Sequence, residues 1–236
     1  MSKLKTFLAA QLLWLPVLAQ AALPAPYSAR YEVLRNGARQ AQSTVELKAA
    51  GGGRSELRSS TLGSEGLAAF ASASVDERSV LRWREGVPET VSWNYRQKVA
   101  WKARERSLAV DPGAGRLDLR DRDKRYSPPY RPGVLDRHAV TVALMHDLAA
   151  GRNGDLRYQV PDKDELETWM FRTGASERID TAIGPQRALR VERVRDSGGG
   201  RSTTLWLAQD RGYVPLRILQ KEPGGETIDM RITSLK

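Results

Sequence analysis

The sequence contains no cysteine and only two histidines. Without cysteine the chain cannot form disulfides, cannot carry a lipid on a cysteine after a leader, and cannot use a thiol as a nucleophile or metal ligand. His138 and His146 are eight positions apart, about 12 Å along a helix, which is too far to share one metal ion. We therefore predict no metal site and no cofactor, and we assign no catalytic residue.

Long hydrophobic runs are also lacking, except near the N-terminus. Lys3 and Lys5 precede an apolar stretch from Phe7 to Leu18, and Ala19-Gln20-Ala21 then offers small residues where a signal peptidase reads. A membrane anchor is the alternative, but this stretch is shorter than the roughly 20 residues that span a bilayer. The sequence predicts a signal peptide at residues 1–21, cleaved after Ala21, and a periplasmic mature protein.

Acidic residues are fewer than basic ones, with 28 Asp and Glu against 38 Lys and Arg, a formal net charge of +10. In a cytoplasmic protein, such an excess of basic residues suggests nucleic acid as a binding partner. Export argues against that partner and leaves anionic lipid, lipopolysaccharide and cell-wall polymers. The charges alternate in sign along the chain, which is more typical of solvated strand faces than of a polyanion site.

Alternation of apolar and polar residues recurs along the mature chain. Tyr27, Ala29 and Tyr31 alternate with polar residues, and Asn36-Gly37 follows as a strong signal for a tight hairpin turn. Similar segments continue to the C-terminus, with turns about every 8–12 residues. Among them we predict hairpin arms at 90–95 and 98–104 and separate strands at 165–172 and 177–182.

The pattern predicts an all-β, mainly antiparallel fold, either a strongly curved sheet or a half-closed β-barrel. Residues 22–236 are expected to form a single β-rich domain. The proline-rich segment 127–133 is interpreted as a long loop within it. One amphipathic helix is predicted from Asp136, a plausible N-cap, to Ala150, with an apolar stripe that includes Leu144 and Leu148.

Aromatic residues supply the candidate ligand site. Trp93 and Tyr95 share a predicted strand face, and Trp101 lies near them across the hairpin, interleaved with basic residues. Aromatic and basic faces of this kind hold sugars or amphipathic headgroups, although core packing with cation–π contacts is the more ordinary interpretation. With the helix stripe, the candidate ligand-binding residues are Trp93, Tyr95, Trp101, Leu144 and Leu148.

Several segments resemble an exported bacterial family, the domain of unknown function 3108 family. The segment Leu205-Trp206-Leu207-Ala208-Gln209-Asp210 and the Tyr213-Val214-Pro215-Leu216 stretch are similar to that family's closing hairpin. The Asn36-Gly37 turn is similar to its first hairpin, and Met145-His146-Asp147-Leu148 to the end of its helix. The resemblance implies a periplasmic protein with a fold distantly similar to periplasmic lipoprotein carriers, and it carries no catalytic residues.

Three functions are open at this point. The first is a non-enzymatic periplasmic protein that binds a lipid, an acyl chain or another amphipathic envelope component in envelope maintenance. The second is an Arg-rich surface module that binds anionic lipid or lipopolysaccharide through peripheral membrane contact. The third is a hydrolase of envelope polymers, which would need His138 or His146 to meet a distant carboxylate and a hydroxyl. We rank them in this order, and the oligomeric state is left open.

Overall fold

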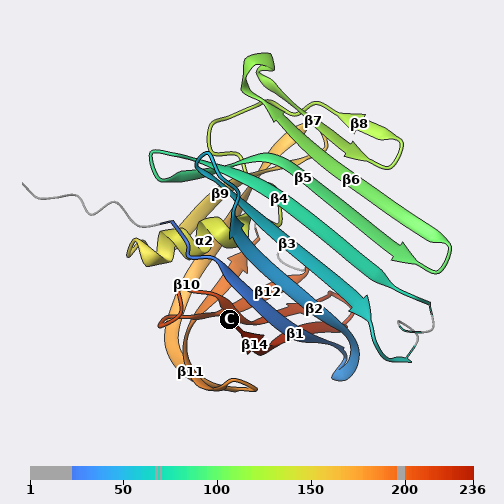
Figure 1. Ribbon diagram of the computed structural model, residues 1–236, viewed down its shortest axis with the longest axis vertical. Helices are drawn as coiled ribbons and strands as arrows, with labels where there is room; N and C mark the ends of the chain where they lie inside the picture. Colours follow the sequence, from blue (N-terminus) through green and yellow to red (C-terminus); the bar gives the residue numbers. More distant parts are fainter. Residues whose placement is uncertain (1–22, 67–68, 70, 196–199) are drawn as a thin grey trace, which may run out of the picture.

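The computed structural model describes residues 23–66, 69, 71–195 and 200–236, and the predicted signal peptide lies outside this part of the chain. The described residues form one antiparallel sheet of 14 strands (Figure 1). Each strand pairs with its successor in both halves of the chain, and β1 pairs with β14. This arrangement confirms the all-β antiparallel prediction.

The strands fall into two runs separated by the helix. The first run contains β1 (Tyr27–Arg35), β2 (Ala38–Ala49), β3 (Arg54–Gly63), β4 (Ser74–Arg84), β5 (Val87–Val99), β6 (Lys102–Asp111), β7 (Arg116–Asp121) and β8 (Lys124–Tyr126), with the short 3-10 helix η1 (Pro112–Ala114) before β7. The second run contains β9 (Asp155–Asp162), β10 (Glu165–Thr181), β11 (Gly184–Val194), β12 (Ser202–Ala208), β13 (Pro215–Lys221) and β14 (Thr227–Leu235).

Helix α2 (Val140–Ala149) lies between the two curved halves of the sheet (Figure 1). It is buried more completely than a single apolar stripe requires, since Val140 and every residue from Val142 to Leu148 are buried. The regular helix begins four residues after the predicted start. Asp136 still caps the preceding turn, because its Oδ1 accepts from the amides of His138 and Ala139, each at 2.9 Å.

The proline-rich loop bridges the gap between the two ends of the sheet. The amide of Thr90 on β5 donates to Val134 O, and the amide of Leu135 donates to Gln159 O on β9, each at 2.9 Å. The carboxylate of Glu89 holds the same loop by accepting from Tyr130 Oη and from the Gly133 amide. The segment after the prolines therefore connects the edge strand β9 to β5, while the end strands β8 and β9 are not paired with each other.

The core has a large and a small part. The large part surrounds α2 and includes Tyr31, Leu57, Leu81, Phe171 and Leu207. The small part lies under the proline-rich loop and comprises Trp93, Leu108, Leu117, Leu119 and Val134. Their strand residues occupy inward-facing positions, as the period-two pattern predicted, and the helix and the segment before it supply most of the rest.

For the hairpin with predicted arms at 90–95 and 98–104, the predicted position of the turn was wrong. Strand β5 continues through residues 96 and 97 to Val99, and the chain turns at Ala100 and Trp101. Ala100 adopts a left-handed φ of 52° without being glycine, and its amide donates to Ala71 O at 2.7 Å. A turn built on alanine carries no sequence signal of the usual kind.

The two strands predicted at 165–172 and 177–182 are one strand, β10, of 17 residues. The register against β11 shifts between Thr173 and Ser176, so Gly174 marks a bulge within the strand and not a turn. A Cβ atom on Gly174 would lie 3.3 Å from the Arg190 carbonyl oxygen. The glycine therefore permits close approach of the two strands where β10 bends.

Candidate functional site

A cavity of about 590 Å³ opens inside the curved sheet, next to the N-terminal turn of α2. One part of its wall is apolar and is contributed by both halves of the sheet and by the helix. Its apolar lining residues include Tyr27, Val45, Leu57, Val140, Phe171, Leu205, Ile218 and Met230. The size is within the range of roughly 300–1,000 Å³ typical of small-molecule sites.

Another part of the same wall is charged. Four arginines line it, namely Arg137, Arg193, Arg195 and Arg201, together with the acids Glu77, Asp162 and Glu167. The acids already have partners: Trp93 Nε1 donates to Glu77 at 2.7 Å, and Trp169 Nε1 donates to Glu167 at 3.0 Å. The cavity thus combines an apolar region with a cation-rich one.

Glu77 is the most perturbed carboxyl of the cavity. Its pKa is raised to about 7, because burial and the nearby carboxyl of Asp136 outweigh the hydrogen bond from Trp93 and the charge of Arg137, which lower it. A carboxyl with this pKa is partly protonated near neutral pH. It therefore contributes less negative charge to the cavity than its residue type indicates.

Ser79, Asp136 and His138 meet at the edge of the cavity. Ser79 Oγ donates to Asp136 Oδ1 at 2.8 Å and lies 3.1 Å from His138 Nδ1. In a nucleophilic triad the histidine takes the serine proton and the carboxylate orients the histidine. Here the carboxylate binds the serine directly, and Ser79 is fully buried. The group caps the helix turn, and burial lowers the pKa of His138 to about 3, which keeps its imidazole neutral.

The other histidine, His146, is buried in the core. Its ring packs edge-on against Trp83, with centroids 5.0 Å apart. The adjacent Asp147 accepts from Tyr158 Oη at 2.9 Å and pairs with Arg152, also at 2.9 Å. No cluster of three or more His, Asp or Glu side chains suited to a metal ion occurs within the described residues.

The structure separates the five candidate ligand residues. Trp93 is 2% exposed in the small core, with Tyr95 beside it at a ring distance of 6.2 Å. Trp101 is 88% exposed at the tip of the β5–β6 hairpin and does not join them. Leu144 and Leu148 are buried in the large core. Trp93 is next to two residues that line the cavity, since its Nε1 donates to Glu77 and Arg137 lies over its ring. A ligand role for these five residues stays a prediction.

The residues that do line the cavity include ones that sequence reasoning missed. Arg193 in β11 and Arg195 just after it lie two and four residues beyond the buried Val191, so alternation alone would have directed them inward. The signal was overlooked because charged side chains are normally assigned to the wet face. Trp169 was recognised only as a strand residue.

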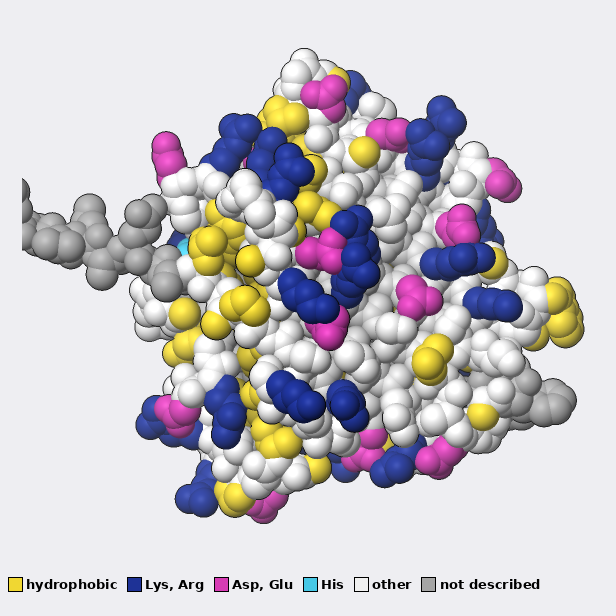
Figure 2. Space-filling view, in the orientation of Figure 1, with side chains coloured by type: hydrophobic (Ala, Val, Ile, Leu, Met, Phe, Trp, Pro, Cys, Tyr) yellow, Lys and Arg dark blue, Asp and Glu magenta, His cyan; other side chains and the backbone are white. Residues whose placement is uncertain are grey.

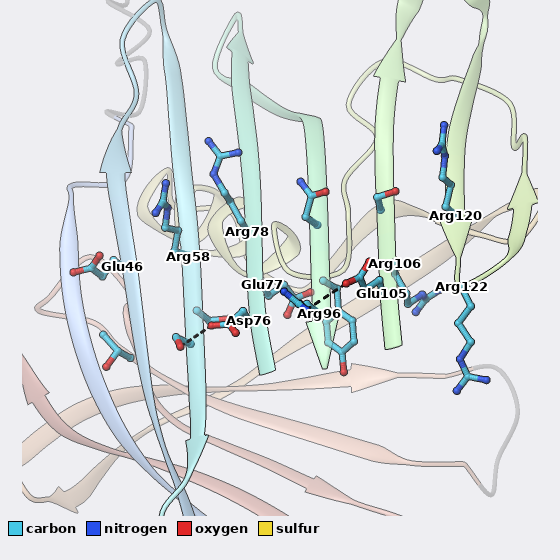
Figure 3. A pocket seen from close by; sticks show the side chains of 16 residues that line it. Glu46, Arg58, Asp76, Glu77, Arg78, Arg96, Glu105, Arg106, Arg120 and Arg122 are labelled. Atoms are coloured by element: carbon cyan, nitrogen blue, oxygen red, sulfur yellow. Dashed lines mark hydrogen bonds and ion pairs between the residues drawn. The ribbon is translucent and has the colours of Figure 1, made fainter. Parts of the chain in front are cut away.

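A second hollow, of about 770 Å³, lies over β2 to β7 on the sheet face that points away from α2 (Figure 3). Arg58 on β3 pairs across the strands with Arg78 on β4, and Ser107 with Arg120. These cations are paired with acids: Arg78 Nε donates to Glu56 at 2.8 Å, and Arg120 pairs with Asp118 at the same distance. Figure 2 shows cations and acids interspersed over this face, so no unbroken cationic field forms there.

No helix of the described residues is long and apolar enough to cross a membrane. The family model described as "Protein of unknown function (DUF3108)" matches residues 26–233. The chain belongs to the DUF3108 family. The resemblance noted in the sequence is therefore confirmed, and a search of curated proteins finds no match.

Solved structures similar to this DUF3108 protein share little sequence with it. The β-barrel-like DUF1849 protein from Brucella abortus is 9% identical, with a TM-score of 0.57 over 89% of this chain and 97% of that one. This likeness shows a shared fold. MucB is 14% identical, with a TM-score of 0.35 over 93% of this chain and 55% of that one. A putative outer membrane lipoprotein-sorting protein domain from Vibrio parahaemolyticus is 10% identical, with a TM-score of 0.24 over 89% and 84%.

Proposed function

We propose that this DUF3108 protein is exported to the periplasm and there binds one amphipathic molecule, such as a lipid or an acyl chain, without transforming it. The cavity carries the proposal, since its wall divides into an apolar and a charged part. Burying an acyl chain is favourable by about 0.8 kcal/mol for each CH₂ removed from water. The charged part can keep a polar headgroup solvated or paired.

The position of the cavity supports carriage of a ligand. It lies between the two halves of a continuous sheet, and the helix turn at Arg137 to Thr141 forms part of its wall. A ligand held there would be shielded by strands that are rigidly paired along their length. A cavity of this kind can protect an acyl chain from water during passage through an aqueous compartment.

The other two functions have weaker support in the geometry. The cations of the outer face are ion-paired, which weakens the case for a broad anion-binding surface. The hydroxyl of Ser79 is fully buried and bound to Asp136, which weakens the case for a hydrolytic group at His138. Ligand binding in the cavity uses features that neither alternative explains.

Native mass spectrometry tests the proposal. The full chain, exported and processed in a bacterial host, is delipidated, incubated with an envelope lipid extract, repurified and measured without denaturation. We expect one molecule of a lipid-sized compound for each protein chain. Recovery of the bare protein after every incubation would count against the proposal. Heat-unfolded protein carried through the same steps controls for nonspecific retention.

A further inference from the structure

Two of the cavity arginines, Arg193 and Arg195, each have a buried Nε–H group. Neither Nε–H donates to an acceptor within the described part of the chain. A buried N–H group without an acceptor costs free energy, because water satisfied that donor before folding. Such donors persist where something other than the protein supplies the acceptor.

Arg193 is also held in a fixed position. Its guanidinium carbon lies 3.4 Å from the ring centroid of Trp169, which stacks the planar group against the indole. Burial, together with the neighbouring charge of Arg195, lowers the pKa of Arg193 to about 10. Mutual repulsion of this kind is relieved when an anion binds between two cations.

The acids of the cavity are engaged with other groups. Glu77 accepts from Trp93 and Glu167 from Trp169, whereas Asp162 lies 3.9 Å from Arg106 Nη2. Of the other two cavity arginines, Arg201 pairs with Glu222 at 2.5 Å, and the guanidinium carbon of Arg137 lies 5.8 Å from the ring centroid of Trp93. Arg193 and Arg195 are therefore the cations of this wall that are positioned to take an external anion.

We propose that Arg193 and Arg195 bind the anionic headgroup, a carboxylate or a phosphate, of the amphipathic ligand whose chain occupies the apolar part of the cavity. This inference rests on the proposed function and narrows its ligand to anionic amphiphiles. Guanidinium groups match the geometry of carboxylate and phosphate oxygens with paired N–H donors. The stacked Arg193 loses little freedom on binding, since Trp169 already orients it.

Calorimetric titration of the delipidated full chain tests the assignment with four probes: palmitate, lysophosphatidate, the neutral methyl palmitate, and inorganic phosphate alone. We expect both anionic amphiphiles to bind at least about tenfold more tightly than methyl palmitate, the loss typical of one charge-assisted hydrogen bond. Inorganic phosphate should bind far more weakly than lysophosphatidate. Equal affinity for phosphate and lysophosphatidate would show a free-anion site and overturn the headgroup assignment.

Variants separate binding from packing. Arg193→Gln and Arg195→Gln should each weaken palmitate binding about tenfold and leave methyl palmitate unchanged. Arg187→Gln is the matched control, because Arg187 lies on the same strand and pairs with Asp210 outside the cavity. If Arg193→Gln loses binding of both palmitate and methyl palmitate and is also less stable to urea, Arg193 is a packing residue and the assignment is overturned.

Failure of the two proposals can be told apart. If no amphiphile binds, charged or neutral, the proposed function itself fails. If charged and neutral amphiphiles bind equally well, the cavity carries ligand but Arg193 and Arg195 do not select its headgroup. Arg193→Lys offers a further check, since it keeps the charge but loses the planar fork, and it should restore only part of the affinity.

A separate observation concerns Trp101. It is 88% exposed at the tip of the β5–β6 hairpin, and Val99 beside it is also exposed. Lys98 and Lys102 flank this tip. Exposed tryptophan next to lysine is unusual for a solvated turn, and both residue types are favoured at a bilayer interface.

The hairpin tip lies at the same end of the sheet as the arginines of the cavity. Strand meanders place alternate turns at opposite ends, so the β5–β6 turn shares one end of the sheet with the end of β11 and the start of β12. Lys98 pairs with Ser74 on β4, next to the cavity-lining Val75. We infer that the Trp101 hairpin docks on the surface of a bilayer that contains anionic lipid.

Sedimentation with phospholipid vesicles tests this docking. Wild-type protein should bind vesicles that contain phosphatidylglycerol, and Trp101→Ser should reduce the bound fraction severalfold. Val87→Ser is the matched control, because Val87 is an exposed apolar residue at the opposite end of the sheet. Equal binding by Trp101→Ser and wild type, or no binding by either, would overturn the inference. Binding to neutral phosphatidylcholine vesicles at the same level would overturn the role of the lysines.

Discussion

Thr90 and Asp136 hydrogen-bond to each other twice. Thr90 Oγ1 donates to Asp136 Oδ2 at 2.8 Å and accepts from the Asp136 amide at 2.8 Å. The pair joins β5 to the turn that begins the helix, 46 residues later in the chain. Because both residues are buried, the contact ties the proline-rich loop and α2 to the first half of the sheet.

Replacing Thr90 by valine should lower the free energy of unfolding by about 1–3 kcal/mol, because the buried carboxylate and amide of Asp136 lose a partner. Thr90→Ser keeps the hydroxyl and is the matched control, with a smaller loss expected. Urea unfolding followed by circular dichroism measures both. Equal destabilisation by valine and serine would mean that the methyl group, and not the hydroxyl, stabilises this contact.

Glu77 makes stability depend on pH. Its pKa rises from 4.5 to about 7 on folding because of burial, so the native state keeps a proton that the unfolded chain releases. The stabilisation is complete below pH 4.5 and is lost as the pH rises through about 7, over a span of up to about 3 kcal/mol. Glu77→Gln cannot titrate and keeps an acceptor for Trp93.

The measurement is urea unfolding of wild type and Glu77→Gln across that pH range. The stability of wild type relative to the variant should decline as the pH rises from 4.5 to about 7. His138 has its pKa lowered by burial and acts with the opposite sign, but both proteins contain it, so its effect cancels in the difference. A pH-independent difference would show that Glu77 titrates normally.

The sequence predicted those parts of the fold that depend on local signals. Alternation placed Tyr27, Ala29 and Tyr31 on the buried face, and Asn36-Gly37 forms the expected turn, with φ values of 51° and 81°. Asp136 was identified as a cap from its place before the helix. These features depend on residues that are close together in the sequence, so the local pattern is sufficient to predict them.

Features that depend on distant contacts could not be predicted. The pairing of β1 with β14 joins the two ends of the described chain, and alternation holds equally well for an open sheet. The same limit applies to the cavity, since Arg193 and Trp169 meet through pairing of β10 with β11. The exposed position of Trp101 follows from an alanine turn that has no sequence signature.

Filling the cavity should abolish ligand binding without unfolding the protein. Ile218 lines the apolar part of the cavity, and Leu219 beside it on β13 points to the opposite face of the sheet. Ile218→Trp should reduce binding of palmitate at least about tenfold, since the indole occupies the volume of the chain. Leu219→Trp is the matched control and should bind normally.

Intact-mass measurement of the exported protein tests the leader. We expect a mature chain that begins at Ala22, because Ala19 and Ala21 supply the small side chains that signal peptidase requires. Ala21→Tyr places a bulky side chain at the cleavage site and should leave the precursor uncut and bound to membranes. Cell fractionation distinguishes the outcomes. An intact leader on wild-type protein that stays soluble in the cytosol would remove the basis for export, and with it the envelope origin of any ligand in the cavity.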